Sequence, residues 1–398
     1  MHLDAQEREW TAAEIRELIR RRLRPHFATL ARCNSTAELH ADPLYQRLAG
    51  TIQRVFESPE IGHFSTGEEP ARDSYRVLAW NLERGIQLDG QIEAFHTHEY
   101  LRTADVLLLT ETDVGMARTG NRDVACELAK ELGFHYAFVP CYLNLVKGAG
   151  SEREVEGEND LGLHGNALLS RYPIREVRAI SLKNGIDKMS GREKRLGSQA
   201  AVAAEIEFPN YRMTAVSVHL DANSTQRHRR DQMRTVLDAL PANGPVLIGG
   251  DWNTTTFNSS TAFHAIMGFW QRVVMGPDNV IRNHYLHPYN RFEKELFELL
   301  EKRGYDYRTT NSLGEYTIYY AFENDRTYQG LAEWVPQWCF PFIRWSLRNH
   351  NGRCPLKLDW FAARGLETAD PAVIHDLREN REVPLSDHDA VGLDVRVP

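Results

Sequence analysis

Short apolar runs, each closed by a polar residue, recur along the chain. The sharpest example is residues 246–248, Val-Leu-Ile, which have the length and composition of a short buried strand. Gly249 and Gly250 follow and allow the backbone to turn sharply. Asp251 and Asn253 come next, and residues i and i+2 of an extended chain point to the same side. The pattern therefore predicts a strand that delivers a carboxylate and a carboxamide to one spot.

The same pattern predicts many strands, with helices between some of them and hairpins between others. The expected strands are residues 76–81, 106–111, 136–139, 165–170, 200–208, 211–220, 246–248, 356–362 and 390–397. The expected helices are residues 123–132, 225–240 and 291–302. Such a mixture predicts an α/β protein in which two packed mixed sheets carry helices on their outer faces.

The first 70 residues have a separate, helical character. Thr11 and Glu14 form a capping box, and Asp42 followed by Pro43 marks a second helix start. We therefore predict an N-terminal helical extension over residues 1–70.

Residues 58–73, with Pro, Gly and charged residues, are expected to be a linker into a main domain over residues 71–398. Within that domain, residues 148–162 are rich in Gly, Glu and Asn and are expected to be a long surface loop. Residues 257–353 are irregular and aromatic, and we expect this insertion to shape specificity.

Composition narrows the class of protein. The chain of 398 residues is 42% hydrophobic and 26% charged, which is ordinary for a globular protein, and its formal net charge is -8. A negative chain has no general electrostatic reason to bind a phosphate backbone non-specifically. The five cysteines form no Cys-x-x-Cys pair, and no run of about 18 apolar residues occurs. These features predict a cytoplasmic protein without a transmembrane segment.

Polar residues at the ends of the predicted strands suggest a metal site. They are Asn81, Glu83, Glu111, His219, Asp251, Asn253, Asp359, Asp387 and His388. Grouped carboxylates repel one another unless a cation lies among them. Carboxylate and carboxamide oxygens suit Mg²⁺ or Mn²⁺, and a histidine beside such a site can protonate a phosphate oxygen.

Seven motifs in order resemble the endonuclease/exonuclease/phosphatase superfamily, from about residue 75 to the C-terminus. They are Trp-Asn-Leu-Glu at 80–83, Leu-Thr-Glu-Thr-Asp at 109–113, Gly-Asn-Ala-Leu-Leu-Ser-Arg-Tyr-Pro-Ile at 165–174, Val-His-Leu-Asp at 218–221, Gly-Asp-Trp-Asn at 250–253, Leu-Asp-Trp-Phe at 358–361 and Ser-Asp-His-Asp at 386–389. The resemblance implies a deoxyribonuclease I-like fold, a four-layer α/β/β/α sandwich with the site at one edge of the paired sheets.

The resemblance also implies roles for the metal and the water. Asn81 and Glu111 would hold Mg²⁺ or Mn²⁺, with Asp387 completing or supporting the site. Asp251 would position and deprotonate the attacking water, and Asn253 would orient Asp251.

Further roles concern the phosphate. His219 would hydrogen-bond it, and His388 would bind a non-bridging oxygen while Asp359 orients its ring. Asn166 would line the edge of the site and contact the substrate. Asp113 departs from the usual motif, and is either a hydrogen-bond acceptor behind the site or a turn residue.

These motifs predict a metal-dependent hydrolase of phosphate esters, in the first place a phosphodiesterase or nuclease acting on nucleic acid or a nucleotide. A phosphatase or a lipid phosphodiesterase with the same site is the alternative, and a catalytically silent binding protein is a third reading. Aromatic residues crowd the region 316–345, where core packing, base stacking and membrane docking are all compatible with the sequence. The sequence leaves the substrate and the oligomeric state open.

Overall fold

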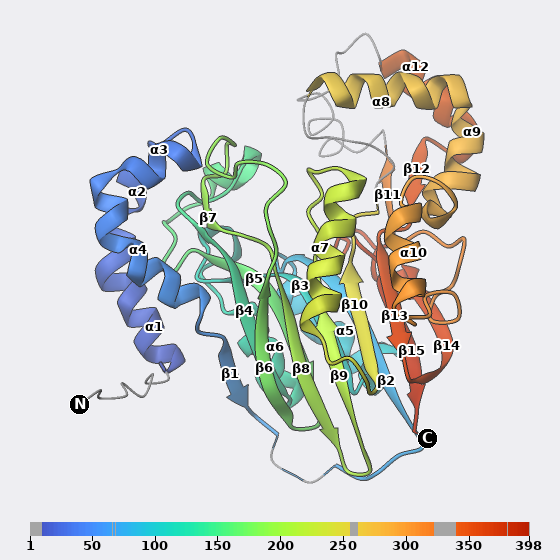
Figure 1. Ribbon diagram of the computed structural model, residues 1–398, viewed down its shortest axis with the longest axis horizontal. Coiled ribbons are helices and arrows are strands. Elements are labelled where there is room, and N and C mark those ends of the chain that lie inside the picture. Colours follow the sequence, from blue (N-terminus) through green and yellow to red (C-terminus); the bar gives the residue numbers. More distant parts are fainter. Residues whose placement is uncertain are drawn as a thin grey trace.

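Two β-sheets form the centre of the molecule (Figure 1). This computed structural model describes residues 10–65, 67, 69–254, 262–321, 340–379 and 381–397. The strands of the larger sheet are β1 (Glu60–His63), β2 (Ser74–Arg84), β3 (Val106–Val114), β4 (His135–Asn144), β5 (Leu163–Ser170), β7 (Arg195–Gly197), β14 (Glu367–Ile374) and β15 (Ala390–Arg396). Their order is β1-β4-β5-β3-β2-β15-β14, with β7 paired to β4.

The smaller sheet packs against the first. Its strands are β6 (Ile174–Ser181), β8 (Ala200–Phe208), β9 (Tyr211–Ser217), β10 (Val246–Asp251) and β13 (Asp359–Arg364), in the order β13-β10-β9-β8-β6. β8 and β9 are the antiparallel hairpin that the sequence predicts, with Pro209 and Asn210 in its turn.

Side chains alternate between the two faces of each sheet. In β3, Leu108 lies in the core between the sheets, whereas Leu107 and Leu109 pack outward. The outward face is covered by α5 (Leu88–Thr97) and α6 (Val124–Leu132). The smaller sheet is covered in the same way by α7 (Gln226–Ala239) and α10 (Lys294–Lys302). The predicted four-layer α/β/β/α sandwich is confirmed.

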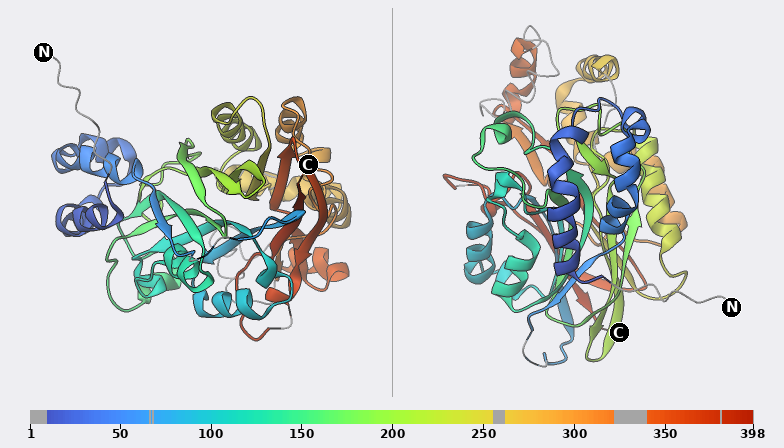
Figure 2. Two further views of the ribbon diagram at one scale, coloured as in Figure 1. Left: turned by 90° about the horizontal axis from the view of Figure 1, so that it is seen from below. Right: turned by 90° about the vertical axis from the view of Figure 1, so that its left-hand side faces the viewer.

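The N-terminal helices form a group at one side of the sandwich (Figure 2). They are α1 (Ala12–Leu18), α2 (Phe27–Leu30), α3 (Thr36–Ala41) and α4 (Pro43–Phe56). Their buried apolar residues, such as Ile19 and Val55, share one core with Phe138 of β4. Residues 60–63, predicted to belong to a linker, instead form β1, which pairs antiparallel with β4.

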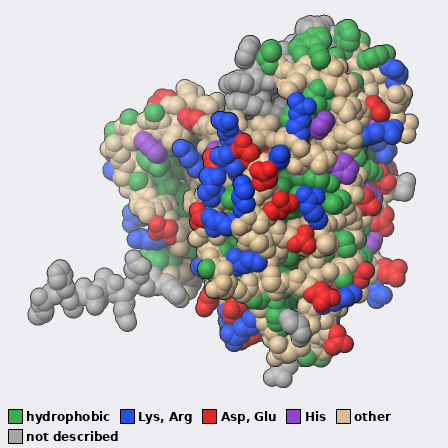
Figure 3. All heavy atoms as spheres, turned by 45° about the vertical axis from the view of Figure 1, so that its right-hand side comes forward, with side chains coloured by type: hydrophobic (Ala, Val, Ile, Leu, Met, Phe, Trp, Pro, Cys, Tyr) green, Lys and Arg blue, Asp and Glu red, His purple; other side chains and the backbone are tan. Residues whose placement is uncertain are grey.

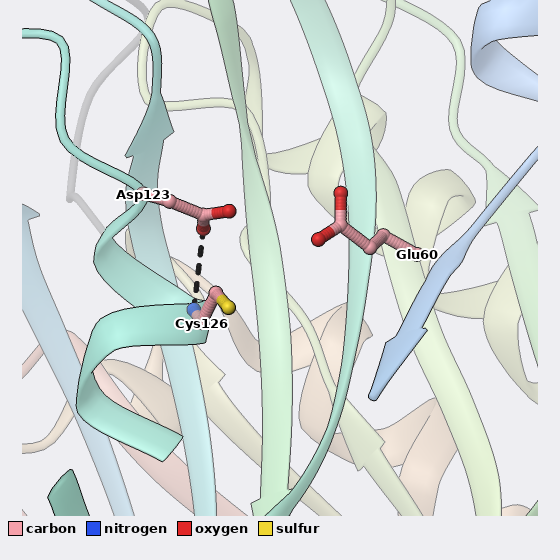
Figure 4. Close-up of side chains that lie close together, drawn as sticks. All are labelled: Glu60, Asp123 and Cys126. Atoms are coloured by element: carbon pink, nitrogen blue, oxygen red, sulfur yellow. Dashed lines mark hydrogen bonds between the residues drawn. The ribbon is translucent and has the colours of Figure 1, made fainter. Parts of the chain in front are cut away.

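Arg16 of α1 ties this extension to the sandwich. Its guanidinium lies 2.6 Å from the Glu60 carboxylate and also contacts Asp123. Glu60 and Asp123 face each other beside Cys126, whose backbone N–H donates to Asp123 (Figure 4). These three side chains have the spacing of a metal site, but the cation among them is Arg16.

The insertion forms a lobe above the end of β10 (Figure 1). The helix α10 of the insertion packs on the smaller sheet, and the other described elements of the insertion are α8 (Ala262–Met275), α9 (Pro277–Val280), β11 (Ile318–Ala321), α12 (Phe340–Leu347) and β12 (Arg353–Leu356). The aromatic residues Phe322, Tyr328, Trp334 and Trp338 lie outside the described residues. Among the helices that the structure describes, none is both long enough and apolar enough to cross a membrane.

The strand directions bring the polar strand ends together. β2 and β3 run parallel in the larger sheet, and β9 and β10 run parallel in the smaller one. The carboxyl ends of parallel neighbours meet at the same edge of a sheet. The ends of all four strands thus face one edge of the sandwich.

Candidate active site

A hydrogen bond between the two sheets marks this edge as one site. The Asn81 side-chain amide, in β2, donates to Asp251 Oδ2 at 3.1 Å and to Glu111 Oε1 at 3.3 Å. Glu111 belongs to β3 and Asp251 to β10, so one carboxamide joins a carboxylate from each sheet. Asn81, Glu111 and Asp251 therefore lie together in the structure, although 170 positions of the sequence separate Asn81 from Asp251.

The backbone at these strand ends is irregular. The β2–β3 register shifts between Asn81 and Arg84, and the β3–β5 register shifts between Leu109 and Thr112. Glu111 has a φ of 54°, in the left-handed region that residues other than glycine rarely adopt. Bulges and strained backbone of this kind redirect side chains, and they concentrate at functional sites.

Asp251 lies at the centre of the cluster and is buried. Its Oδ1 accepts the Asn253 backbone N–H at 2.8 Å, and its Oδ2 lies 3.5 Å from His219 Nε2 and 3.8 Å from His388 Nε2. Burial raises the pKa of Asp251, and the charges of His388 and His219 offset part of that rise. A carboxylate with a raised pKa is a better proton acceptor than a free one, which suits a general base.

His388 is held by a carboxylate on its other ring nitrogen. His388 Nδ1 lies 2.8 Å from Asp359 Oδ2, and both residues are buried. Burial lowers the pKa of His388, but the charges of Asp359 and Asp251 raise it well above the ordinary value. These two carboxylates therefore favour the cationic form of the ring, with Nε2 directed toward Asp251.

Neighbouring backbone fixes the loop that carries His388. Ser386 Oγ donates to the Asn81 carbonyl at 2.6 Å and accepts the His388 N–H at 3.1 Å. The Trp80 indole N–H donates to the His388 carbonyl at 3.0 Å. The loop before β15 is thus bound to the end of β2.

The donors around Glu111 fit a hard divalent cation. Burial alone would raise the pKa of Glu111, but the charges of Arg84, His219, His164 and His388 hold it well below its usual range. Glu111 is therefore an ionised carboxylate beside the Asn81 carboxamide, and oxygen donors of these two types are those that Mg²⁺ and Mn²⁺ select.

Two predicted site residues are joined to this cluster less directly. Asp387 is exposed, and its carboxylate lies 3.5 Å from Ser386 Oγ. Asn166 is buried, and its amide donates to the Ala200 carbonyl of the opposite sheet at 2.8 Å. That hydrogen bond joins the two sheets, and the role of Asn166 toward a substrate stays a prediction.

Asp113, left open by the sequence, is the centre of a buried ion-pair network. It accepts two hydrogen bonds from Arg118, at 2.7 and 3.0 Å, and lies 2.8 Å from His164 Nδ1. Arg118 also reaches Glu152 and Glu193, which belong to two loops beside the site. Asp113 thus anchors the loops through Arg118 and is not a simple turn residue.

Sequence reasoning did not predict the position of Arg84 beside Glu111. Its guanidinium lies 3.2 Å from Glu152, and its charge is the largest that lowers the pKa of Glu111. A register shift directs this side chain, and the apolar pattern carries no signal of such a shift.

Comparison with known sequences shows the family of the chain. The sequence profile of the Endonuclease/Exonuclease/phosphatase family matches residues 78–388, and the chain belongs to that family. No curated protein matches the chain in sequence.

Several solved structures match most of the length of the chain at low sequence identity. An endonuclease/exonuclease/phosphatase from Beutenbergia cavernae is 16% identical, with a TM-score of 0.47 over 82% of this chain and 72% of that one. The catalytic domain of human nocturnin is 15% identical, with a TM-score of 0.44 over 85% and 96% of the two chains. An AP endonuclease from Archaeoglobus fulgidus is 13% identical, with a TM-score of 0.45 over 80% and 98%.

Proposed function

We propose that this protein is a metal-dependent phosphodiesterase of the nuclease type, in which Asp251 activates the attacking water. One observation carries the proposal. Asp251 is in contact with Asn81 on one side and with two histidines, His219 and His388, on the other. A candidate proton acceptor, a carboxamide that would help to hold a metal, and two imidazole donors for a phosphate are therefore side by side.

Each side chain then has a task. Asn81, Glu111 and Asp387 would hold Mg²⁺ or Mn²⁺, which neutralises charge on the phosphate when bound. Asp251 takes the proton of a water molecule, and Asn253 keeps the carboxylate in place through its backbone N–H.

The histidines act on the phosphate itself. His388 and His219 donate hydrogen bonds to its non-bridging oxygens, where negative charge grows in the transition state. Asp359 holds the His388 ring in one tautomer. The new bond joins the water oxygen to phosphorus, and the bond to the leaving oxygen, which solvent protonates, breaks.

The substitution Asp251→Asn tests the proposal. The amide keeps the shape of the side chain but cannot take a proton, so we expect turnover to fall at least about 10²-fold with little change in melting temperature. Asp105→Asn is the matched control, because Asp105 is a buried aspartate just before the start of β3, whereas the site lies at its other end. That control should retain turnover. An unchanged rate in Asp251→Asn would exclude this assignment.

A lipid phosphodiesterase is the second candidate, because the insertion carries an exposed apolar patch. Hydrophobic side chains gather at the top of the molecule (Figure 3). Among them, Val274 is 85%, Trp345 57% and Phe342 50% exposed, and Trp270 of α8 lies 6.4 Å from Phe342 of α12 between ring centroids. Exposed patches of this kind mark interaction sites.

A substrate panel separates the two candidates. Plasmid DNA, single-stranded DNA and RNA, phospholipid and sphingolipid vesicles, and inositol phosphates are each assayed with Mg²⁺ and with a chelator. Activity on lipids alone would reject the nuclease assignment, and activity on monoesters alone would indicate a phosphatase. No turnover and no Mn²⁺ binding by calorimetry would favour a silent binding protein.

A further inference from the structure

A lysine beside the candidate site is buried without a partner. Lys357 joins β12 to β13 and is fully buried, and its ammonium makes no hydrogen bond within the described part of the chain. Its Nζ lies over the face of Trp360, 5.0 Å from the ring centroid. A buried charge without a partner costs stability, so a fold retains one where it serves another purpose.

The backbone holds this lysine in place. The Lys357 carbonyl accepts from Thr254 Oγ1 at 2.5 Å. Thr317 Oγ1 accepts the backbone N–H groups of Leu358 and Asp359, at 3.0 and 3.1 Å. The hydrogen bonds that fix the start of β13 at Asp359 therefore also fix the backbone of Lys357.

The Asp359 carboxylate, whose charge is opposite to that of Lys357, has one oxygen without a hydrogen-bond partner among the described residues. Its Oδ2 accepts from His388, but its buried Oδ1 has no hydrogen-bond partner among the described residues. Burial lowers the pKa of Lys357 to about 8, and the charges of Asp359 and Glu315 oppose that shift. Two buried atoms of opposite charge, Lys357 Nζ and Asp359 Oδ1, thus each lack a hydrogen-bond partner among the described residues, although they belong to residues only two positions apart.

We propose that Lys357 is a positioning residue of this active site, whose ammonium balances the charge of Asp359 and so supports the hydrogen bond by which Asp359 holds His388. The inference rests on the proposed function. Buried carboxylates crowd this site, with Asp251 and Asp359 paired in register between β10 and β13. The charges of Lys357 and Asp359 interact, and a fixed cation beside these carboxylates offsets their repulsion.

The substitution Lys357→Met tests the inference. Methionine fills much of the same volume without charge, so we expect kcat to fall about tenfold with KM unchanged. The melting temperature should rise, because an unpaired buried charge is removed. Lys188→Met is the matched control for stability, because Lys188 is an ion-paired lysine 3.1 Å from Asp221, and its removal should lower the melting temperature.

A double-mutant cycle identifies the group through which Lys357 acts. In an Asp359→Asn background, Lys357→Met should leave kcat unchanged, since the charge to be balanced is gone. In that background Lys357→Met should raise the melting temperature more than in the wild type, because the ammonium has already lost the opposing charge of Asp359. A rise in KM with kcat unchanged would overturn the inference in favour of direct substrate contact.

The two readouts also separate this inference from the proposed function. If the wild-type protein hydrolyses no phosphate ester, the proposed function fails, and the melting temperatures alone still test the coupling. Equal temperature shifts in both backgrounds would show that Lys357 and Asp359 do not interact, and would overturn the inference whatever the activity.

Discussion

At the scale of single residues, Asp251 and Asn253 come together for a reason different from the predicted one. The sequence predicts an extended chain in which both side chains point to the same side. In the structure β10 ends at Asp251, and Asn253 has a φ of 47°. A local turn joins the two residues, with the Asn253 N–H donating to Asp251 Oδ1. The pairing was predictable from the residue types, but the backbone geometry was not.

Arg84 and Lys357 show a second limit to what the sequence predicts about single residues. Each acts on a carboxylate of the site, Glu111 and Asp359 respectively. Long basic side chains occur over the whole surface of most proteins, so a single arginine or lysine carries little positional signal. Their places depend on a register shift and on a strand start, which follow from tertiary packing.

Gly250 gives a prediction at the same scale. Its φ is 135°, and an added Cβ would lie 2.2 Å from the Val218 carbonyl oxygen. Gly250→Ala should therefore displace β10 from β9, destabilise the fold by several kcal/mol, at least about 2, and remove activity by moving Asp251.

Gly244→Ala is the matched control for Gly250→Ala. Gly244 also has a positive φ, 94°, but open space surrounds its Cβ position. We expect only the backbone cost, about 1 kcal/mol, in urea unfolding, with activity retained. Equal losses in the two variants would show that contact with Val218 is unimportant.

At the scale of elements, strongly patterned segments were predicted well and edge segments were not. The helix predicted at 123–132 is α6, capped by Asp123 and ended by Gly133. β6 and β14 are strands of the sheet edges with mixed exposure, and they lack the regular alternation on which the prediction depends. In α5 a buried glutamine, Gln91, interrupts the apolar stripe.

The pairing of α7 with α10 depends on a buried ion pair. Arg229 of α7 donates from Nε to Glu293, which precedes α10, at 3.1 Å, and both side chains are fully buried. Glu293→Ala should cost about 3–5 kcal/mol of unfolding free energy, because it removes the carboxylate that pairs with a buried guanidinium. Urea unfolding measures the loss.

An exposed pair between the same two helices is the control for Glu293→Ala. Glu295, which contacts Arg230, is 56% exposed in its side chain. Glu295→Ala should cost at most about 1 kcal/mol. Similar losses of unfolding free energy in the two variants would show that burial of the Arg229–Glu293 ion pair does not increase its contribution.

At the scale of the whole molecule, the sequence predicts the number and kind of layers, and the structure adds how the extension joins them. The resemblance covers the sandwich but not the first 70 residues. The helices α1–α4 nevertheless share a core with β4, and β1 extends the larger sheet between them. No local pattern could predict this junction, because Arg16 meets Asp123 across 107 positions of the chain.

That junction makes the stability of the whole molecule dependent on pH. Burial and the charge of Glu60 raise the pKa of Asp123 to about 6, and Arg16 opposes that rise. The folded pKa lies above the unfolded value of about 3.9. Folding therefore takes up a proton, and stability falls as pH rises from about 4 through about 6.

Arg16→Ala should enlarge the loss of stability with rising pH and extend it to higher pH, because Glu60 and Asp123 then repel each other without the Arg16 cation between them. We expect a loss of about 1–3 kcal/mol at pH 8 and a smaller loss at pH 5, where Asp123 is mostly protonated. Urea unfolding at both pH values measures the difference. Arg22→Ala, at an exposed position of the same helical segment, should change little at either pH. An equal loss for Arg16→Ala at pH 5 and pH 8 would show that Arg16 acts through packing rather than through these two carboxylates.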